Sequence, residues 1–234
     1  MGRRYDWLLF DADDTLFDFG AGSRAAILEV LVGFGIEPHP VTVACYEAVN
    51  AMMWRRGDLG ELNQTQIAEG RFFHFLACLG RSDIDHLEMN AAYKATLAKQ
   101  SVLFKGALEM VRGLHEKGYR MAIVTNGLAQ VQHGRLDESP IRRFFEGLFI
   151  SEEVGARKPQ PEMFDAVCER LGIDDRSRAV MIGDNLQSDI LGGNLAKIDT
   201  IWYNYNLATR NNEIIPGYEV SNYEALVAVI EGET

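Results

Sequence analysis

The sequence predicts an α/β fold, a doubly wound parallel sheet with an inserted helical cap. Short apolar runs that indicate buried strands alternate with segments of helical spacing, and one long interval lacks strands. A buried parallel strand is a continuous apolar run, and alternation with helices of this length indicates crossover connections. The 234 residues, 47% of them apolar, are enough for one full α/β domain plus an accessory unit.

Five apolar runs are predicted to be the buried strands. The first covers residues 7–10 and leads directly into Asp11-Ala12-Asp13-Asp14-Thr15. The others cover residues 121–125, 148–150, 179–182 and 200–203. Segments with helical spacing follow or separate them, at residues 107–117, 130–138, 162–171 and 188–196. Pro161, at the start of the third helix, is a typical first-turn residue.

The interval between Leu16 and Phe104 contains no run that resembles a buried strand. It contains helical stretches instead, separated by glycine-containing breakers, at residues 23–32, 41–54, 64–79 and 84–98. We therefore expect a helical cap over residues 18–102, inserted after the first strand into a core of residues 1–17 and 103–234. The cap would start beside Asp11, where a lid can exclude water from a site.

Composition excludes several classes of partner. The net charge of −11 argues against a nucleic-acid polymer, because such partners require a basic surface. No apolar run approaches the ~18 residues of a membrane span, and Asp11 interrupts the first one before a signal-peptide core forms. The three cysteines are odd in number and far apart, which fits reduced thiols. We expect a cytoplasmic monomer or dimer without membrane contact.

Polar side chains follow four of the predicted strands. Asp11 and Asp13 come after the first strand, and two carboxylates so close repel each other unless a cation or a shared proton is present. Thr125-Asn126-Gly127, after the second strand, can form a neutral cradle for phosphoryl oxygens. Lys158, after the third strand, is followed by prolines at 159 and 161 that restrict its backbone. Asp184 and Asp189 follow the fourth strand.

Each of these motifs alone has an ordinary explanation, such as an acidic turn or a solvated lysine. Together they are more specific, because open α/β sheets place their chemistry beyond the carboxyl ends of the strands. Hard oxygen ligands with an open coordination position suit Mg²⁺. The set also contains a carboxylate nucleophile, a second carboxylate for proton transfer, a cation and donors for phosphoryl oxygens, which are the parts needed for phosphoryl transfer.

The ordered set Asp11-x-Asp13-x-Thr15, Thr125-Asn126-Gly127, Lys158-Pro159 and Gly183-Asp184…Asp189 resembles the haloacid dehalogenase-like (HAD) hydrolase superfamily, with its Rossmann-like core, over nearly the whole chain. Within that superfamily the chain resembles the house-cleaning pyrimidine 5′-nucleotidases in particular. The segments that carry this second resemblance are residues 10–17, Ala48-Val49-Asn50 with Trp54, Gly70-Arg71-Phe72, and residues 150–155 and 188–193.

The resemblance implies a role for each acidic residue. Asp11 would attack phosphorus and form an aspartyl-phosphate, and Asp13 would protonate the leaving oxygen and then activate water. Mg²⁺ would be held by the carboxylates of Asp11 and Asp184 and by the backbone carbonyl of Asp13. Asp189 would orient a metal-bound water or Lys158.

The resemblance also assigns the phosphate-binding groups. Thr125 and the backbone of Asn126 would hold a phosphoryl oxygen, with Gly127 allowing close approach. Lys158 would offset the negative charge on Asp11 and on the transferring group, because two anions approach each other only when their repulsion is cancelled.

Asp13 favours a phosphatase over a dehalogenase. Haloacid dehalogenases use the same nucleophile without a metal and lack an acid at the equivalent of Asp13, since a halide leaves without protonation and an alkoxide does not. Two positions depart from the family pattern. Asn185 stands where Ser or Thr is common. Lys197 stands where Gly commonly ends a helix, and a non-glycine residue there would be strained if its backbone is left-handed.

Substrate choice is expected to lie in the cap. Asn50, Trp54 and Arg71 are candidates for facing the pocket, through base stacking or contact with polar edges. In the alternative, Trp54 packs in the cap and Arg71 is a surface charge. We expect a phosphomonoesterase for a small phosphorylated metabolite, a pyrimidine or non-standard nucleoside monophosphate. The alternatives are sugar phosphates or other small esters, or a phosphoryl-ligand-binding protein without turnover.

Overall fold

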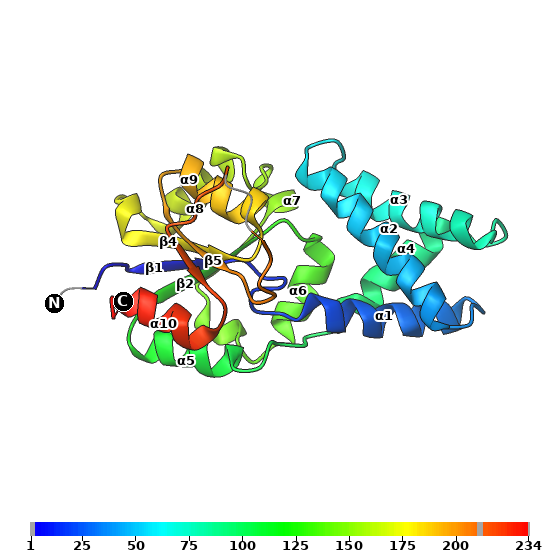
Figure 1. Cartoon of the computed structure of the whole chain (residues 1–234), viewed down its shortest axis with the longest axis horizontal. Coiled ribbons are helices and arrows are strands. Elements are labelled where there is room, and N and C mark those ends of the chain that lie inside the picture. Colours follow the sequence, from blue (N-terminus) through cyan, green and yellow to red (C-terminus); the bar gives the residue numbers. More distant parts are fainter. Residues whose placement is uncertain (1–2, 210–212, 234) are drawn as a thin grey trace.

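The computed structural model describes residues 3–209 and 213–233. Among these residues, six parallel strands form one sheet in the order β3-β2-β1-β4-β5-β6 (Figure 1). The strands are β1 (Trp7–Phe10), β2 (Arg120–Thr125), β3 (Gly147–Ile150), β4 (Ala179–Gly183), β5 (Asp199–Tyr203) and β6 (Tyr218–Val220). The predicted doubly wound fold class is confirmed, and β1 is a central strand with β2 and β4 as its neighbours.

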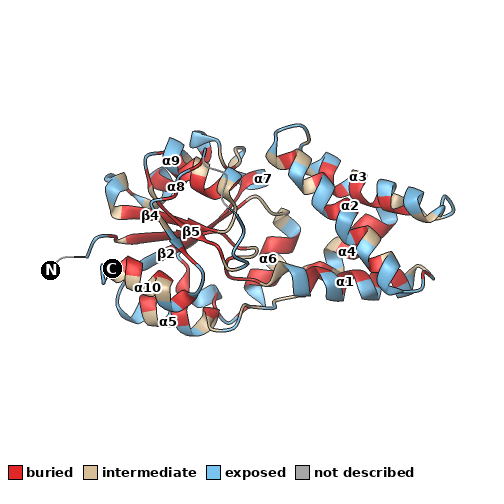
Figure 2. Ribbon diagram, in the orientation of Figure 1, coloured by how far each residue is buried: buried red, intermediate tan, exposed pale blue. Residues whose placement is uncertain are grey.

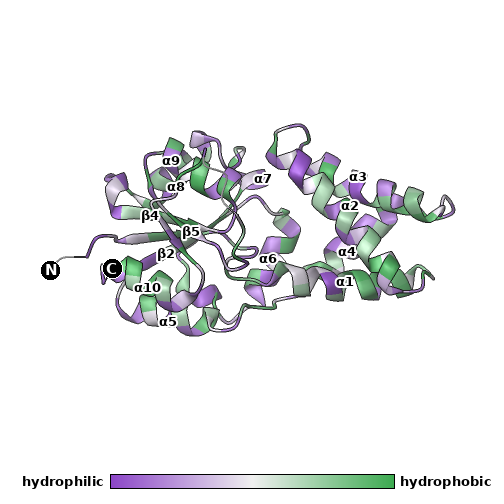
Figure 3. Ribbon diagram, in the orientation of Figure 1, coloured by the Kyte–Doolittle hydropathy of each residue, from purple (hydrophilic) through white to green (hydrophobic). Residues whose placement is uncertain are grey.

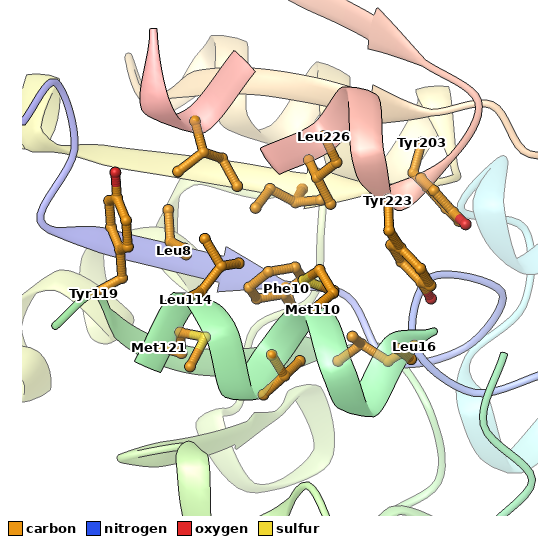
Figure 4. Close-up of a cluster of buried hydrophobic side chains, with 14 of the residues drawn as sticks. Leu8, Phe10, Leu16, Met110, Leu114, Tyr119, Met121, Tyr203, Tyr223 and Leu226 are labelled. Atoms are coloured by element: carbon orange, nitrogen blue, oxygen red, sulfur yellow. The ribbon is translucent and has the colours of Figure 1, made fainter. Parts of the chain in front are cut away.

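Helices cover both faces of the sheet, as the continuous apolar strands require. On one face, Leu8 and Phe10 of β1 pack with residues of α5 (Ala107–Glu116) and α10 (Tyr223–Glu231), as Figure 4 shows. On the other face, Trp7 and Leu9 pack with residues of α8 (Pro161–Leu171), near α9 (Leu191–Leu195). Successive side chains of β1 therefore point to opposite faces of the sheet and belong to two different hydrophobic clusters.

The remaining core elements connect these layers. They are α6 (Ala129–Asp137), α7 (Ser151–Val154), the 3₁₀ turns Arg142–Phe144 and Arg176–Arg178, and a π-helical turn, Leu186–Ile190, that leads into α9. The helix predicted over residues 188–196 thus begins as a π-helical turn. No helix in the described part of the chain is both long enough and apolar enough to cross a membrane.

Four helices between β1 and α5 form the group beside the sheet in Figure 1: α1 (Phe19–Gly33), α2 (Pro40–Asp58), α3 (Gln64–Leu79) and α4 (His86–Leu97). We call this group the cap. Figures 2 and 3 show buried, hydrophobic residues and exposed, hydrophilic ones on each helix, as expected for helices around a shared core. At its centre the rings of Tyr46, Phe72, Phe75 and Tyr93 contact one another. The limits of 18 and 102 for a separate domain stay a prediction.

The two ends of the cap lie together. Phe17 and Leu103 form an antiparallel bridge, and the Asp18 N–H donates to the Val102 carbonyl oxygen at 3.0 Å. Val131 of α6 belongs to the hydrophobic cluster of the cap. The cap therefore leaves the core at one point and also packs against it through α6.

Besides α7 and the 3₁₀ turns, β6 and α10 were not predicted. β6 has only three residues, lies at the edge of the sheet and exposes Glu219, so it lacks the apolar run of a buried strand. α10 buries Tyr223, Leu226 and Ile230 against the sheet, at helical spacing. Lys197 has a φ of 58°, so the strain expected for a non-glycine residue at that helix end is present.

Candidate active site

Strand register brings the predicted strand-end residues to one place. Phe10 of β1 is level with Ile123 of β2 and with Ile182 of β4. Asp11 therefore lies one residue beyond these pairs, and its N–H donates to the Ile182 carbonyl oxygen at 2.8 Å. Thr125 and Asp184 follow on the neighbouring strands, so their side chains meet that of Asp11 at the carboxyl edge of the sheet.

Lys158 is the buried cation of this edge, with 1% of its surface exposed. Its Nζ lies 2.5 Å from Asp11 Oδ1 and 2.7 Å from Asp189 Oδ1, and it donates to the Val124 carbonyl oxygen at 2.7 Å. Burial alone would lower the pKa of Lys158, but the two carboxylates outweigh burial and the pKa is raised. Lys158 therefore stays charged near neutral pH.

The Asn126 side chain holds the backbone of Lys158. Its Oδ1 accepts from the Lys158 N–H and its Nδ2 donates to the Lys158 carbonyl oxygen, both at 2.9 Å. The carboxamide is thus occupied, while the Gly127 N–H donates to Thr125 Oγ1 at 3.0 Å. The groups of this loop that stay available to a phosphoryl oxygen are the Thr125 hydroxyl hydrogen and the Asn126 N–H.

Asp11, Asp184 and Asp189 each offer a carboxylate oxygen, and the three oxygens lie within 4.8 Å of one another. Burial raises the pKa of Asp11 and of Asp184, and the neighbouring carboxylates raise both further, although Lys158 opposes these shifts. One ammonium does not balance three carboxylates. The excess of hard oxygen donors fits a divalent cation such as Mg²⁺.

Asp189 differs from the other two acids because both of its oxygens are engaged. Oδ1 contacts Lys158, and Oδ2 accepts from the Asn185 N–H at 3.0 Å. Asp189 is fully buried and does not line the cavity described below. This arrangement suits a residue that orients Lys158.

Asp13 is held by two residues that the sequence did not indicate. Arg135, fully buried on α6, forms an ion pair with Asp13, and Gln132 Nε2 donates to Asp13 Oδ2 at 2.7 Å. The two residues are three apart on one helix and therefore share a face. A Cβ at Gly127 would lie 2.1 Å from Gln132 Nε2, so the glycine leaves room for this contact.

A cavity of about 320 Å³ opens over these groups and extends to the cap. Nine of the predicted site residues line it: Asp11, Asp13, Asn50, Trp54, Thr125, Asn126, Gly127, Lys158 and Asp184. Trp54 also packs against the hydrophobic cluster of the cap. Arg71 is absent from the lining and, at 1% exposure, is no surface charge either, so neither predicted placement of Arg71 holds.

Two further carboxylates, given no role from the sequence, line the cavity. Asp14 has a φ of 55°, and burial together with Asp13 raises its pKa to about 6. Asp58, at the end of α2, accepts from Asn185 Nδ2 at 3.3 Å and lies 3.8 Å from Arg157. The residue that departs from the family pattern at 185 therefore contacts the cap.

Gln64 makes a second contact between cap and core. At the start of α3, its Nε2 donates to the Asn126 carbonyl oxygen at 2.6 Å and to Ser151 Oγ at 2.7 Å. The start of α3 is thereby joined to the loop that follows β2.

Comparison with known proteins identifies close relatives. Residues 5–197 match the haloacid dehalogenase-like hydrolase family. The pyrimidine 5′-nucleotidase YjjG of Escherichia coli is 33% identical over 225 residues, 95% of this chain and 96% of that protein. The pyrimidine 5′-nucleotidase PynA of Streptococcus pneumoniae is 31% identical over 227 residues, 97% and 95% of the two chains. The magnesium-bound crystal structure of the HAD-hydrolase YfnB of Bacillus subtilis, 33% identical, has a TM-score of 0.91 and covers 97% of this chain and 99% of its own.

Proposed function

Because this chain belongs to the haloacid dehalogenase-like hydrolases and is therefore a hydrolytic enzyme, we propose that it is a Mg²⁺-dependent phosphomonoesterase for nucleoside monophosphates. The observation that carries the proposal is the presence of Asp13 in the same cavity as Asp11, Lys158 and Asp184. An acid at position 13 suits a reaction in which the leaving group needs a proton.

In the first step Asp11 attacks phosphorus. A bond forms between its carboxylate oxygen and phosphorus as the bond from phosphorus to the ester oxygen breaks, and Asp13 gives its proton to that oxygen. Lys158, 2.5 Å from Asp11, reduces the repulsion between the carboxylate and the phosphate. The Thr125 hydroxyl and the Asn126 N–H donate to the equatorial oxygens.

In the second step water replaces Asp11. Asp13, now ionised, takes a proton from water as the water oxygen bonds to phosphorus and the aspartyl-phosphate bond breaks. Gln132 and Arg135 hold the Asp13 carboxylate on the substrate side of α6.

The metal site is assigned to the acidic cluster. The carboxylates of Asp11 and Asp184 and the Asp13 carbonyl oxygen would hold Mg²⁺, which would supply positive charge to the transferring phosphoryl group. The carboxylate oxygens of Asp11 and Asp184, which lie within 4.8 Å of each other, support their part in this assignment, and so does the magnesium in the YfnB structure.

The nucleotide substrate is supported by the names of the relatives YjjG and PynA and by the cap residues in the cavity wall. Trp54 offers an aromatic surface and Asn50 a carboxamide, which together suit a heterocyclic base. The cytoplasmic location and the monomeric or dimeric state stay predictions.

Phosphate release from nucleoside mono-, di- and triphosphates and from sugar phosphates tests the proposal. We expect turnover of pyrimidine monophosphates that EDTA abolishes and that is lost in Asp11→Asn. The matched control is Asp174→Asn, at an exposed position. Turnover limited to sugar phosphates would contradict the proposed nucleotide substrate and support the proposed reaction. No turnover of any ester by the folded, Mg²⁺-loaded protein would contradict the proposed phosphatase activity.

A further inference from the structure

A buried arginine stands behind the cavity wall in the cap. Arg71 of α3 is 1% exposed, and the described part of the chain places no carboxylate in a salt bridge with it. Its guanidinium lies over the rings of Phe72 and Tyr93, at 5.1 and 4.6 Å from their centroids, and its Nε has no hydrogen-bond partner. A buried charge without a counter-ion is costly, so the groups that do contact it are tightly constrained.

Two amide oxygens receive the Arg71 hydrogen bonds. Nη1 donates to Asn50 Oδ1 at 2.9 Å, and Nη2 donates to Asn90 Oδ1 at 3.3 Å. Asn50 lies on α2 and Asn90 on α4, so the guanidinium joins three helices of the cap. Neutral oxygens and aromatic faces take the place of the missing carboxylate.

Arg71 determines which way the Asn50 carboxamide points. A guanidinium has donors and no acceptors, so the Asn50 atom that faces it is the oxygen. The NH₂ group is turned away from Arg71. Asn50 is 9% exposed and lines the cavity, and its Nδ2 has no acceptor among the described residues. The NH₂ group is therefore left as a free donor on the side of Asn50 away from Arg71, in a residue that lines the cavity.

We propose that Asn50, positioned by Arg71, donates a hydrogen bond to a ring carbonyl oxygen of a pyrimidine nucleoside monophosphate. The inference rests on the proposed function, because it concerns the group that the phosphate carries. The cavity is continuous from Asp11 to Asn50, so a group esterified to the phosphate extends to the cap. Asn50 touches the substrate, while Arg71 is a positioning residue whose charge polarises the amide and strengthens its donor.

Asn50→Asp tests the donor directly. The aspartate has the same shape, gives Arg71 a carboxylate partner, and replaces the donor in the cavity by an acceptor. Two acceptors facing each other repel, so we expect the ratio of kcat/KM for uridine 5′-monophosphate to kcat/KM for ribose 5-phosphate to fall about 10- to 100-fold. Ribose 5-phosphate has the same reacting group and no base.

Asn90→Asp is the matched control. It makes the same chemical change at the other amide that contacts Arg71, and Asn90 does not line the cavity. We expect the substrate ratio to stay within about twofold of the wild type. An equal fall in both variants would overturn the proposal, because the effect would then come from the packing around Arg71.

Substitutions of Arg71 separate positioning from structure. Arg71→Lys keeps a donor toward Asn50 Oδ1, and we expect it to retain the preference for uridine 5′-monophosphate. Arg71→Gln can present either end of its amide and leaves Asn50 free to turn, so KM for uridine 5′-monophosphate should rise about tenfold with kcat within about threefold. If Arg71→Gln does not fold, the comparison of Asn50→Asp with Asn90→Asp decides.

Two negative results have different meanings. A wild-type enzyme that hydrolyses ribose 5-phosphate and not uridine 5′-monophosphate would overturn the proposed nucleotide substrate and this inference together. Normal hydrolysis of uridine 5′-monophosphate by both the wild type and Asn50→Asp would overturn the inference alone.

Discussion

Lys158 in the core and Arg71 in the cap are each 1% exposed, yet their surroundings differ. Lys158 lies between the carboxylates of Asp11 and Asp189. Arg71 has two amide oxygens and two aromatic rings around it. Arg135, the other fully buried arginine of the described residues, follows the pattern of the core and pairs with Asp13.

The difference fits the ligands proposed for the two regions. Carboxylates around a cation create a site with opposed charges at close range, which suits a phosphate and a metal ion. Neutral partners do not neutralise the charge of Arg71. The guanidinium instead fixes the orientation of the Asn50 amide, which suits the binding of an uncharged group. In the proposed function the core would bind the phosphate that all these esters share, and the cap would bind the group that differs among them.

Removing the core cation should have the largest effect. In Lys158→Met, Asp11 and Asp189 would be left buried without a cation, and Asp11 would repel the phosphate, so we expect kcat to fall about 10³-fold. Initial rates of phosphate release at saturating substrate measure it. Lys105→Met, at an exposed lysine, is the control. A rate within tenfold of the wild type would show that the core does not depend on a paired charge.

Arg135→Met should lower the stability of the protein, beside any effect on Asp13. Asp13 would lose its ion-pair partner and α6 its contact with that carboxylate, so the free energy of unfolding should fall by about 3 kcal/mol. Urea denaturation followed by circular dichroism measures this change. Arg142→Met, an exposed arginine nearby, should change it by less than about 0.5 kcal/mol. Similar values for the two variants would contradict the pairing.

The contact between the two regions should have a smaller effect. Gln64→Leu removes the hydrogen bonds to the Asn126 carbonyl oxygen and to Ser151, so the cap is held less firmly over the cavity. We expect KM for uridine 5′-monophosphate to rise about three- to tenfold, with kcat changed less. Thr65→Val, at the next, exposed position of α3, should leave KM unchanged. An unaltered KM in Gln64→Leu would mean that these bonds do not hold the cap.

The smallest effect concerns Asp14, an acid of the core that forms no salt bridge with any residue the structure describes. Burial and Asp13 raise its pKa to about 6. Below about pH 4 both the folded and the unfolded state bind the Asp14 proton. Between about pH 4 and 6 the unfolded state loses this proton while the folded state keeps it. The free energy of unfolding therefore falls as the pH rises through this window. In EDTA, Asp14→Asn should be about 1 kcal/mol more stable than the wild type at pH 7.

The pH dependence is the check on this prediction. Urea denaturation at several pH values should show the gain of Asp14→Asn disappearing near pH 4, while Asp137→Asn, at an exposed acid, shows no such trend. Asparagine tolerates the left-handed backbone at this position, so strain does not confuse the comparison. A gain of equal size at all pH values would exclude ionisation as its cause.

Sequence was sufficient to predict the strand-end residues of the core. Asp11, Thr125 and Asp184 each follow a continuous apolar run, and parallel strands bring such positions to one edge. It was not sufficient for Gln132 and Arg135, because residues three apart occur in every helix and nothing in their spacing points to Asp13. β6 was missed because a three-residue edge strand needs no apolar run.

The cap was harder to predict for a physical reason. Charged partners leave acidic and basic residues at recognisable places in a sequence, but Arg71 is held by asparagine oxygens and aromatic rings, which are common in any helix. Whether an arginine is exposed or buried then depends on how α2, α3 and α4 pack, which is a tertiary property. The sequence indicates Asn50 as a cavity residue, but only the structure shows which way its amide points.

The bridge between Phe17 and Leu103 also bears on how such enzymes diversify. The two crossing points are one hydrogen bond apart, so the intervening segment can be exchanged as a single cassette without stretching the sheet that it interrupts. A donor cassette has to accommodate Val131 and Leu128, which reach into the cap from the core side. A single recombination event at these two points can therefore combine the same sheet edge with a cap that accepts other substrates.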